Sequence, residues 1–355
     1  MSNSTEIATS YKQLPEEIFP ATKFRHIKFT VLGTVALIFF CNFALLWYLS
    51  VFPVNRGYWL VKQKWDILLA LESPVDWLIL GDSSVNQGVS PDVLRAELGE
   101  SSLNLGTVAD MVALDDVWML HTYINKFGPP KNVLIIHTYD MWHRDIQPVF
   151  IGKTPLPWGS WQQLPPHYAL TRQQTLEIFL ARYFPLYADN VTLQNLISKV
   201  ILGKDSLFIK RFMLDEKGFM PVIGGGSTSS DEVRKDAALH IGFVTYNEFD
   251  LSAVNEEALA EIVNLAEQYD MNIYIANSPL YEGVAADENF QAYYGQMQKA
   301  LRKIAAKSGH IFLLETLATF PEEQMQNVDH VILTAAQAYT KMLAAEIKGL
   351  HEAAR

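Results

Sequence analysis

Residues 76–91 read DWLILGDSSVNQGVSP, and this stretch decides the fold that we expect for the chain. The apolar run at 77–80 is too short and too sharply bounded for a helix, so it predicts a buried strand. Gly81, Asp82 and Ser83 follow as small or polar residues suited to a tight turn at the strand's carboxyl end. Ligands bind at this end of open α/β sheets. A serine there is placed for nucleophilic attack, with backbone N–H groups nearby to hold an oxyanion.

The composition of the chain limits what the Gly-Asp-Ser turn can belong to. The 355 residues are 49% hydrophobic, enough for a sizeable core in one large domain or two small ones. A formal charge of -11 argues against a nucleic-acid surface. The single cysteine, Cys41, excludes an intramolecular disulfide.

The N-terminal region contains a long uncharged stretch. Residues 29–52 carry no charge and are long enough to cross a bilayer as a helix, with Trp47 and Tyr48 near the far end as interfacial aromatics. A basic cluster precedes them, so we expect residues 1–28 to be a cytoplasmic tail and the rest of the chain to lie outside. A cleavable signal peptide is the alternative, but the apolar run is long and no small-x-small site follows it. We expect a linker over 53–72.

Strands and helices are expected to alternate through residues 73–355. This pattern predicts an α/β domain with a parallel sheet covered on both faces. Between 146 and 240 the alternation is lost in favour of proline, tryptophan and helical spacing, so we expect an insertion there. The expected strands are 77–80, 102–105, 133–136, 272–276 and 310–314, and the expected helices are 112–125, 255–269, 288–307 and 333–350.

A second chemical element, Asp329-His330, lies just before the last expected helix. An imidazole needs an orienting carboxylate to act as general base toward a serine hydroxyl. An aspartate in the same loop is able to supply that carboxylate. The alternative is a pair of solvated loop residues with no role in chemistry.

Together these pieces resemble the SGNH (GDSL-like) hydrolase superfamily. The matching positions are Ser83 after the first strand, Gly106 in Asn-Leu-Gly after the second, and His330 before the C-terminal helix. The sequence from His330 to Tyr339 is similar to the family's C-terminal ending. The resemblance covers 73–145 and 250–350. It implies a flavodoxin-like, three-layer parallel sheet, which in this chain follows the one N-terminal transmembrane helix expected at 29–52.

The resemblance also implies roles for individual residues. Ser83 would be the nucleophile, His330 the base and Asp329 the orienting acid, with Ser83 and Gly106 contributing oxyanion N–H groups. Tyr139 stands where the family usually has the asparagine of the oxyanion hole, so its phenol is a substitute donor. The family's acid commonly lies three residues before the histidine, where this chain has Asn327. A Ser–His dyad, or another carboxylate, therefore stays open.

Five further residues are substrate-binding candidates. Asp82 and Asn104 are the polar neighbours of the motif residues, and Trp142, Trp158 and Trp161 offer aromatic faces for sugar rings. The alternative for the tryptophans is ordinary packing beneath the insertion.

No metal or cofactor is expected. His137, Asp140, His143 and Asp145 carry ligand types that suit zinc, but no second cluster with ligand spacing accompanies them.

An N-terminal anchor followed by such a domain resembles the bacterial proteins that work with membrane-bound O-acyltransferases. The resemblance implies a periplasmic or extracellular acyltransferase or esterase acting on a cell-envelope or exported polysaccharide, with such an acyltransferase as partner. Transfer is favoured slightly over hydrolysis. The alternative, motivated by the Tyr139 and Asn327 departures, is a non-catalytic scaffold that binds an acyltransferase or a glycan.

Overall fold

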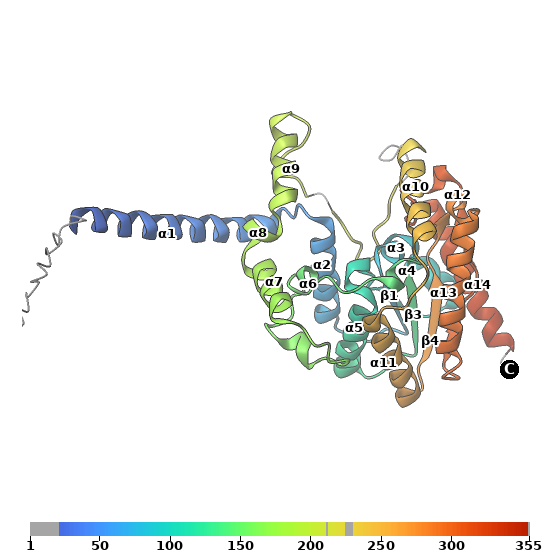
Figure 1. Cartoon of the computed structure of the whole chain (residues 1–355). Helices are drawn as coiled ribbons and strands as arrows, with labels where there is room; N and C mark the ends of the chain where they lie inside the picture. Colours follow the sequence, from blue (N-terminus) through green and yellow to red (C-terminus); the bar gives the residue numbers. More distant parts are fainter. Residues whose placement is uncertain (1–20, 211, 224–229, 354–355) are drawn as a thin grey trace, which may run out of the picture.

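The computed structural model describes residues 21–210, 212–223 and 230–353. An α/β domain is joined to one long helix, α1 (Ala21–Val51), which projects away from it (Figure 1). The first 20 residues of the expected tail lie outside the described residues, and residues 21–28 belong to helix α1 rather than to a separate tail.

A five-stranded parallel sheet forms the centre of the domain, in the order β2-β1-β3-β4-β6. Each of the five expected strands is present. A short parallel pair, β5 and β7, lies apart from the main sheet. The strands are β1 (Trp77–Gly81), β2 (Ser102–Asn104), β3 (Asn132–His137), β4 (Asn272–Asn277), β5 (Leu280–Tyr281), β6 (Ile311–Leu313) and β7 (Thr319–Phe320).

Helices cover both faces of the sheet, and the alternation of side chains along β1 shows why. Leu78 and Leu80 belong to one apolar core, while Trp77 and Ile79 belong to the other. The first core is completed by α2 (Arg56–Ala70), α5 (Val112–Phe127), α11 (Ala253–Tyr269) and α13 (Glu288–Ala305). The second is completed by α3 (Ser83–Gly88), α4 (Pro91–Leu98) and α14 (Leu333–Ala353). A strand apolar on both sides is what such double coverage requires.

The linker expected over 53–72 is mostly helix α2, and it packs in the domain. Trp65 is fully buried, and its indole N–H donates to Asp115 Oδ1 at 2.9 Å. Lys64 is also fully buried, where its Nζ donates to the backbone oxygens of Asn104 and Gly218. Helix α2 is therefore packed in the α/β domain and connects it to the end of α1.

Helix α1 contains the stretch His26–Val51, which is long and apolar enough to span a membrane. The expected span at 29–52 falls almost entirely within it. The side chain of Asn42 donates to the backbone oxygen of Tyr183 at 2.5 Å, and Tyr48 Oη donates to that of Leu207 at 2.6 Å. Helix α1 is thus packed against the region expected to be an insertion.

That region contributes helices and no strand in the part that the structure describes between β3 and α11. Its last helix runs six residues beyond the expected boundary at 240. Figure 1 shows α7, α8 and α9 beside the end of α1, and α10 above the carboxyl ends of the strands. The helices of this region are α6 (Pro148–Ile151), α7 (Arg172–Tyr183), α8 (Pro185–Ala188), α9 (Asn190–Ile201) and α10 (Ser230–Tyr246), with a 3-10 turn at Ser160–Gln163. Elsewhere in the chain there are 3-10 turns at Ala109–Met111, Met141–His143 and Glu322–Gln324 and a short helix α12 (Glu282–Ala285).

Candidate active site

The turn after β1 is built by a glycine and a buried aspartate. Gly81 has a φ of 134°, and a Cβ there would lie 1.8 Å from the backbone oxygen of Ile136, so only glycine fits. Asp82 caps α3, where its Oδ1 accepts from the backbone N–H of Ser84 at 2.8 Å. Ser83 is consequently the first residue of α3 and is partly exposed at the carboxyl end of the sheet.

Asp82 is completely buried and joins the ends of two strands. Its Oδ2 accepts from the backbone N–H and the hydroxyl of Thr138, at 2.7 and 3.0 Å. Burial alone would raise the pKa of Asp82, but His137, Ser84 and Thr138 together hold it well below its usual range. The carboxylate therefore positions Ser83 from beneath and is not presented to a ligand.

His137 links Asp82 to a second buried carboxylate. Its Nε2 lies 2.6 Å from Asp116 Oδ2, and its Nδ1 lies 3.6 Å from Asp82 Oδ2. Burial alone would lower the pKa of His137, yet the two carboxylates raise it to about 9. The imidazolium and its partners form a charged layer below the turn. Beside it, burial raises the pKa of Asp115 to about 7, while Thr107 and Trp65 donate hydrogen bonds that oppose the rise.

His330 lies in the loop before α14, with two acceptors at one ring nitrogen. Its Nδ1 is 2.6 Å from Asp329 Oδ1 and 2.9 Å from Asn327 Oδ1. Asn327 Oδ1 also accepts the backbone N–H of His330 at 2.8 Å. Asn327 thus folds the loop, and the adjacent Asp329 reaches the imidazole.

This arrangement sets the tautomer of His330. With Nδ1–H donated to Asp329, Nε2 carries the lone pair that a general base needs. Burial would lower the pKa of His330, but Asp329 outweighs burial and raises it above 6.5. Burial would likewise raise the pKa of Asp329, and His330 lowers it below its usual value instead.

Ser83 begins α3, and the loop that carries His330 leads into α14, which packs against α3. No hydrogen bond joins the two side chains in the described part of the chain. Catalytic hydrogen bonds are often long or poorly aligned before substrate binds, so a Ser83–His330 pair stays a prediction.

The three expected oxyanion donors differ in their surroundings. Gly106 N–H donates to Asn104 Oδ1 at 3.0 Å, and a Cβ on Gly106 would lie 2.2 Å from Val85 Cγ1 of α3. Tyr139 is buried, and its hydroxyl lies 2.6 Å from His240 Nδ1. The Ser83 N–H is at the first turn of α3, where helix N–H groups are free of intrahelical partners.

The substrate-binding candidates are mostly enclosed. Asn104 is fully buried, and its amide donates to the backbone oxygens of Val85 and Val89, at the two ends of α3. Trp142 and Trp161 are 1% and 2% exposed, which is a packing position rather than a stacking surface. Trp158 is 44% exposed and lies edge-on to Trp161. Of the three tryptophans, only Trp158 offers a surface to a sugar ring.

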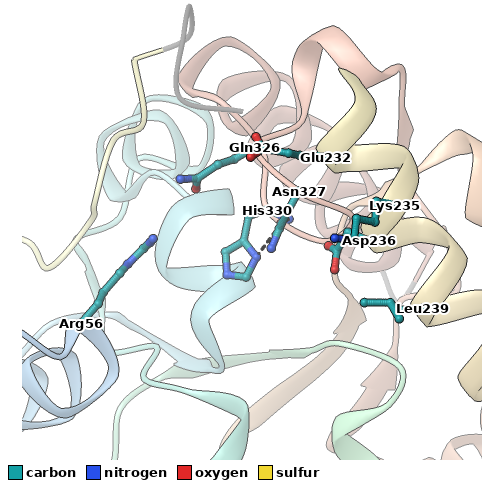
Figure 2. Close-up of a pocket in the computed structure, with 8 residues that line it drawn as sticks. All are labelled: Arg56, Glu232, Lys235, Asp236, Leu239, Gln326, Asn327 and His330. Atoms are coloured by element: carbon teal, nitrogen blue, oxygen red, sulfur yellow. Dashed lines mark hydrogen bonds between the residues drawn. The ribbon is translucent and has the colours of Figure 1, made fainter. Parts of the chain in front are cut away.

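A cavity of about 500 Å³ opens beside His330 (Figure 2). Its wall includes Asn327, Arg56 from α2, and Lys235 and Asp236 from α10. Ser83 is not among the residues that line it. The residues from α2 and α10 were not identified from the sequence, because their approach to the loop depends on long-range packing that no local pattern reveals.

Two buried amides on α3 were also missed. Asn86 and Gln87 are fully buried, and their side-chain atoms have no hydrogen-bond partner among the described residues. They follow Ser83 by three and four positions, which places them on its side of the helix. A signal existed in the sequence, since the stretch 83–88 contains four polar residues in a segment expected to be enclosed.

The metal alternative gains no support from the geometry. Within the described ranges, no group of three His, Cys, Asp or Glu side chains could hold a metal ion. His137 is engaged with Asp116, and Asp140 pairs with Arg144.

Comparisons with known proteins add little. No family model and no curated protein match the chain. One solved structure with similarity is described as a candidate platelet activating factor from Streptococcus pneumonia. It is 12% identical, with 85% of this chain and 95% of that chain covered and a TM-score of 0.35. Likeness at this level assigns neither family nor activity.

Proposed function

We propose that the chain is a membrane-anchored serine enzyme of SGNH type that handles O-acyl groups on a cell-envelope or exported polysaccharide. The observation that carries the proposal is the Asp329–His330 contact at 2.6 Å, which engages Nδ1 and makes Nε2 the ring nitrogen for a proton from Ser83, the first residue of α3 after strand β1. The strand order supports it too. With β6 as the fifth strand, the order is 2-1-3-4-5, that of flavodoxin-like sheets.

The proposed chemistry uses Ser83 as nucleophile. Ser83 Oγ attacks the acyl carbonyl while His330 Nε2 takes its proton, and Asp329 stabilises the imidazolium. The tetrahedral oxyanion accepts from the Ser83 N–H, and collapse expels the alkoxide, which takes the proton back from His330. A sugar hydroxyl or water then attacks the acyl-enzyme while His330 Nε2 takes its proton; the bond between the acyl carbon and Ser83 Oγ breaks, Ser83 regains the proton from His330, and the result is transfer or hydrolysis.

The remaining oxyanion donors need a local rearrangement in this scheme. Gly106 N–H would have to turn from Asn104 Oδ1 toward the oxyanion, and the Tyr139 hydroxyl would have to leave His240. The Ser83 N–H is already in place, whereas the Gly106 N–H becomes available only when substrate binds. This difference agrees with a site that is completed by its substrate or by a membrane partner.

The membrane part of the proposal rests on α1 and its neighbours. The stretch His26–Val51 suits a single span, and the charge pattern favours a cytoplasmic N-terminus and a periplasmic or extracellular domain. Phe184 packs on Phe39 of α1 at 6.1 Å between ring centroids. Because Phe39 lies in the middle of the apolar stretch, this contact supports a position of α7–α9 against the lipid, where a membrane-bound O-acyltransferase would be within reach.

A second candidate function is a non-catalytic scaffold. The absence of a Ser83–His330 hydrogen bond in the described chain, together with the occupied Gly106 N–H, favours it. The retained Asp329–His330 geometry argues against it, since a binding module has no need of an oriented base.

Labelling with a fluorophosphonate separates the two. We would label the full chain in detergent beside Ser83→Ala, His330→Ala and a control at an exposed serine away from the site, Ser73→Ala. Labelling that is lost in the first two variants would support an activated serine, provided each variant keeps its circular dichroism spectrum. Absence of labelling in folded wild type would favour the scaffold.

A further inference from the structure

The cavity beside His330 has two walls of different charge. Figure 2 shows Arg56 on one side and the α10 residues Glu232, Lys235 and Asp236 on the other. The α10 wall mixes both signs of charge. On the α2 wall, Arg56 is the charged residue that lines the cavity.

Arg56 has no acid partner in the described part of the chain. Its Nη2 is buried without a hydrogen-bond partner, and no Asp or Glu oxygen among the described residues lies within ion-pair distance. Burial lowers the pKa of the Arg56 guanidinium. Arg56 as a whole is partly exposed, and its guanidinium remains charged, so it is available to a ligand that supplies the counter-charge and a partner for the buried Nη2.

Arg56 is held rigidly at the start of α2. Asn55 Oδ1 caps the helix by accepting the backbone N–H of Tyr58 at 3.1 Å. The Tyr58 ring packs edge-on to Phe150 at 5.0 Å, and its hydroxyl donates to the backbone oxygen of Ala188 at 3.4 Å. The guanidinium is therefore presented from a fixed backbone, as a recognition site requires.

Arg56 is also close enough to His330 to influence it. Both residues line the cavity, and the charge of Arg56 opposes protonation of His330. An anion bound at Arg56 would lie beside the nitrogen that we propose takes the proton of Ser83.

We propose that Arg56 is an anion-binding residue that recognises a carboxylate or phosphate group carried by the glycan substrate. The planar fork of arginine suits two-point contact with either oxyanion. Glu232 and Asp236 on the opposite wall repel the anion and turn the hydroxyl side of the sugar toward α10. The assignment of this ligand as substrate rests on the proposed function, whereas the binding of an anion at Arg56 does not.

The test is a binding measurement on the full chain in detergent, in the Ser83→Ala background so that no turnover occurs. Calorimetric titrations would use trigalacturonate for the carboxylate, glycerol 3-phosphate for the phosphate and cellotriose as the neutral control. The variants are Arg56→Gln, Arg56→Lys, which keeps the charge but not the fork, and Lys235→Gln as a matched cavity-wall control.

We expect Arg56→Gln to weaken binding of the preferred anion at least 10-fold, Arg56→Lys to weaken it less, and Lys235→Gln to change it less than 3-fold. Tighter binding of trigalacturonate would identify a uronate, and tighter binding of glycerol 3-phosphate a phosphate. Failure of wild type to bind either anion more tightly than cellotriose would overturn the proposal. An equal loss of anion affinity in the Lys235→Gln and Arg56→Gln variants would also overturn it. Circular dichroism spectra of the variants, together with the binding retained by Arg56→Lys, show whether a loss of affinity is due to misfolding.

The outcomes are independent of the serine chemistry. Anion binding at Arg56 in a protein that a fluorophosphonate does not label would retain the site and reject the enzyme. Labelling of Ser83 without anion binding would support the serine enzyme and reject the anion site at Arg56.

Discussion

At the scale of the residue, the pairing of Asp329 with His330 is the feature on which the chemistry depends. The aspartate is adjacent in sequence, and Asn327 Oδ1 bends the loop so that its carboxylate reaches Nδ1. The sequence predicts Asp329 as the orienting acid, and the side-chain geometry is compatible with that role, which stays a prediction.

Asp329→Asn should slow hydrolysis of p-nitrophenyl acetate by on the order of 10²- to 10⁴-fold, because the imidazole loses its tautomer and its counter-charge. His330 must be neutral to act as base, so kcat/KM should rise with pH through its raised pKa. In the variant this rise should move to lower pH. Glu72→Gln, an exposed carboxylate, is the control. An unchanged pH profile in Asp329→Asn would contradict the role of Asp329.

The buried His137 makes a separate prediction about stability. Its pKa in the folded protein is about 9, above the 6.5 of the unfolded chain, so its contribution is complete below pH 6.5 and is lost as pH rises through 9. The free energy of unfolding should fall by up to about 3 kcal/mol over this window. Thermal unfolding at pH 6.5 and 9.5 measures the loss as a change in Tm.

Asp116→Asn should flatten this dependence, because it removes the nearer carboxylate from His137. Glu261→Gln removes a comparable partner from His121 on the surface, where the pair lies 2.9 Å apart, and serves as control. If both variants keep the wild-type slope, His137 is not the group responsible.

At the scale of the element, the site depends on the close approach of α3 to the end of β2. The contact leaves no space for a side chain at position 106, where a Cβ would lie 2.2 Å from Val85 Cγ1 and 2.9 Å from the backbone oxygen of Asp82.

Gly106→Ala should therefore push α3 away from β2 and destabilise the domain by roughly 1–3 kcal/mol. Fluorophosphonate labelling of Ser83 should fall with it, because the turn that presents the serine is displaced. Gly295→Ala is the matched control, since Gly295 lies within α13, a methyl group there would meet nothing within 4 Å, and alanine favours a helix. A Tm for Gly106→Ala equal to that of wild type would contradict this prediction, because α3 and β2 would then accommodate a methyl group without loss of stability.

The elements also show what the sequence could and could not reveal. Strand β1 and the turn at Gly81 were predictable because a short buried apolar run ended by glycine has few alternatives. The packing of helix α2 was not predictable for the stretch expected to be a linker, since it depends on Trp65 reaching Asp115 fifty residues away. The position of α10 over the cavity was not predictable for the same reason: residues 232–240 meet the His330 loop only through the tertiary fold.

At the scale of the whole molecule, the helices beside α1 offer a prediction about the membrane. Phe39, which contacts Phe184, lies 12 residues before the end of α1 at Val51. At 1.5 Å per residue this is about 18 Å along the helix, comparable with half of a bilayer core of about 30 Å. If α1 spans the membrane with Val51 at the edge of the hydrocarbon, Phe184 reaches the bilayer core, and the adjoining helices α8 and α9 lie against lipid.

The exposed apolar side chains of α9 agree with that position, since Val191, Ile197 and Ile201 are 65%, 49% and 79% exposed. We would place an environment-sensitive NBD label at Ile201→Cys in a Cys41→Ala chain and reconstitute it in nanodiscs. The label should show blue-shifted emission and be quenched by doxyl-labelled lipids, because lipid covers this face. A label at Glu288→Cys, on α13 away from α1, is the control and should behave as in water (Figure 1). Identical behaviour at the two positions would remove α9 from the membrane, and would leave α1 as the sole contact that holds the domain there.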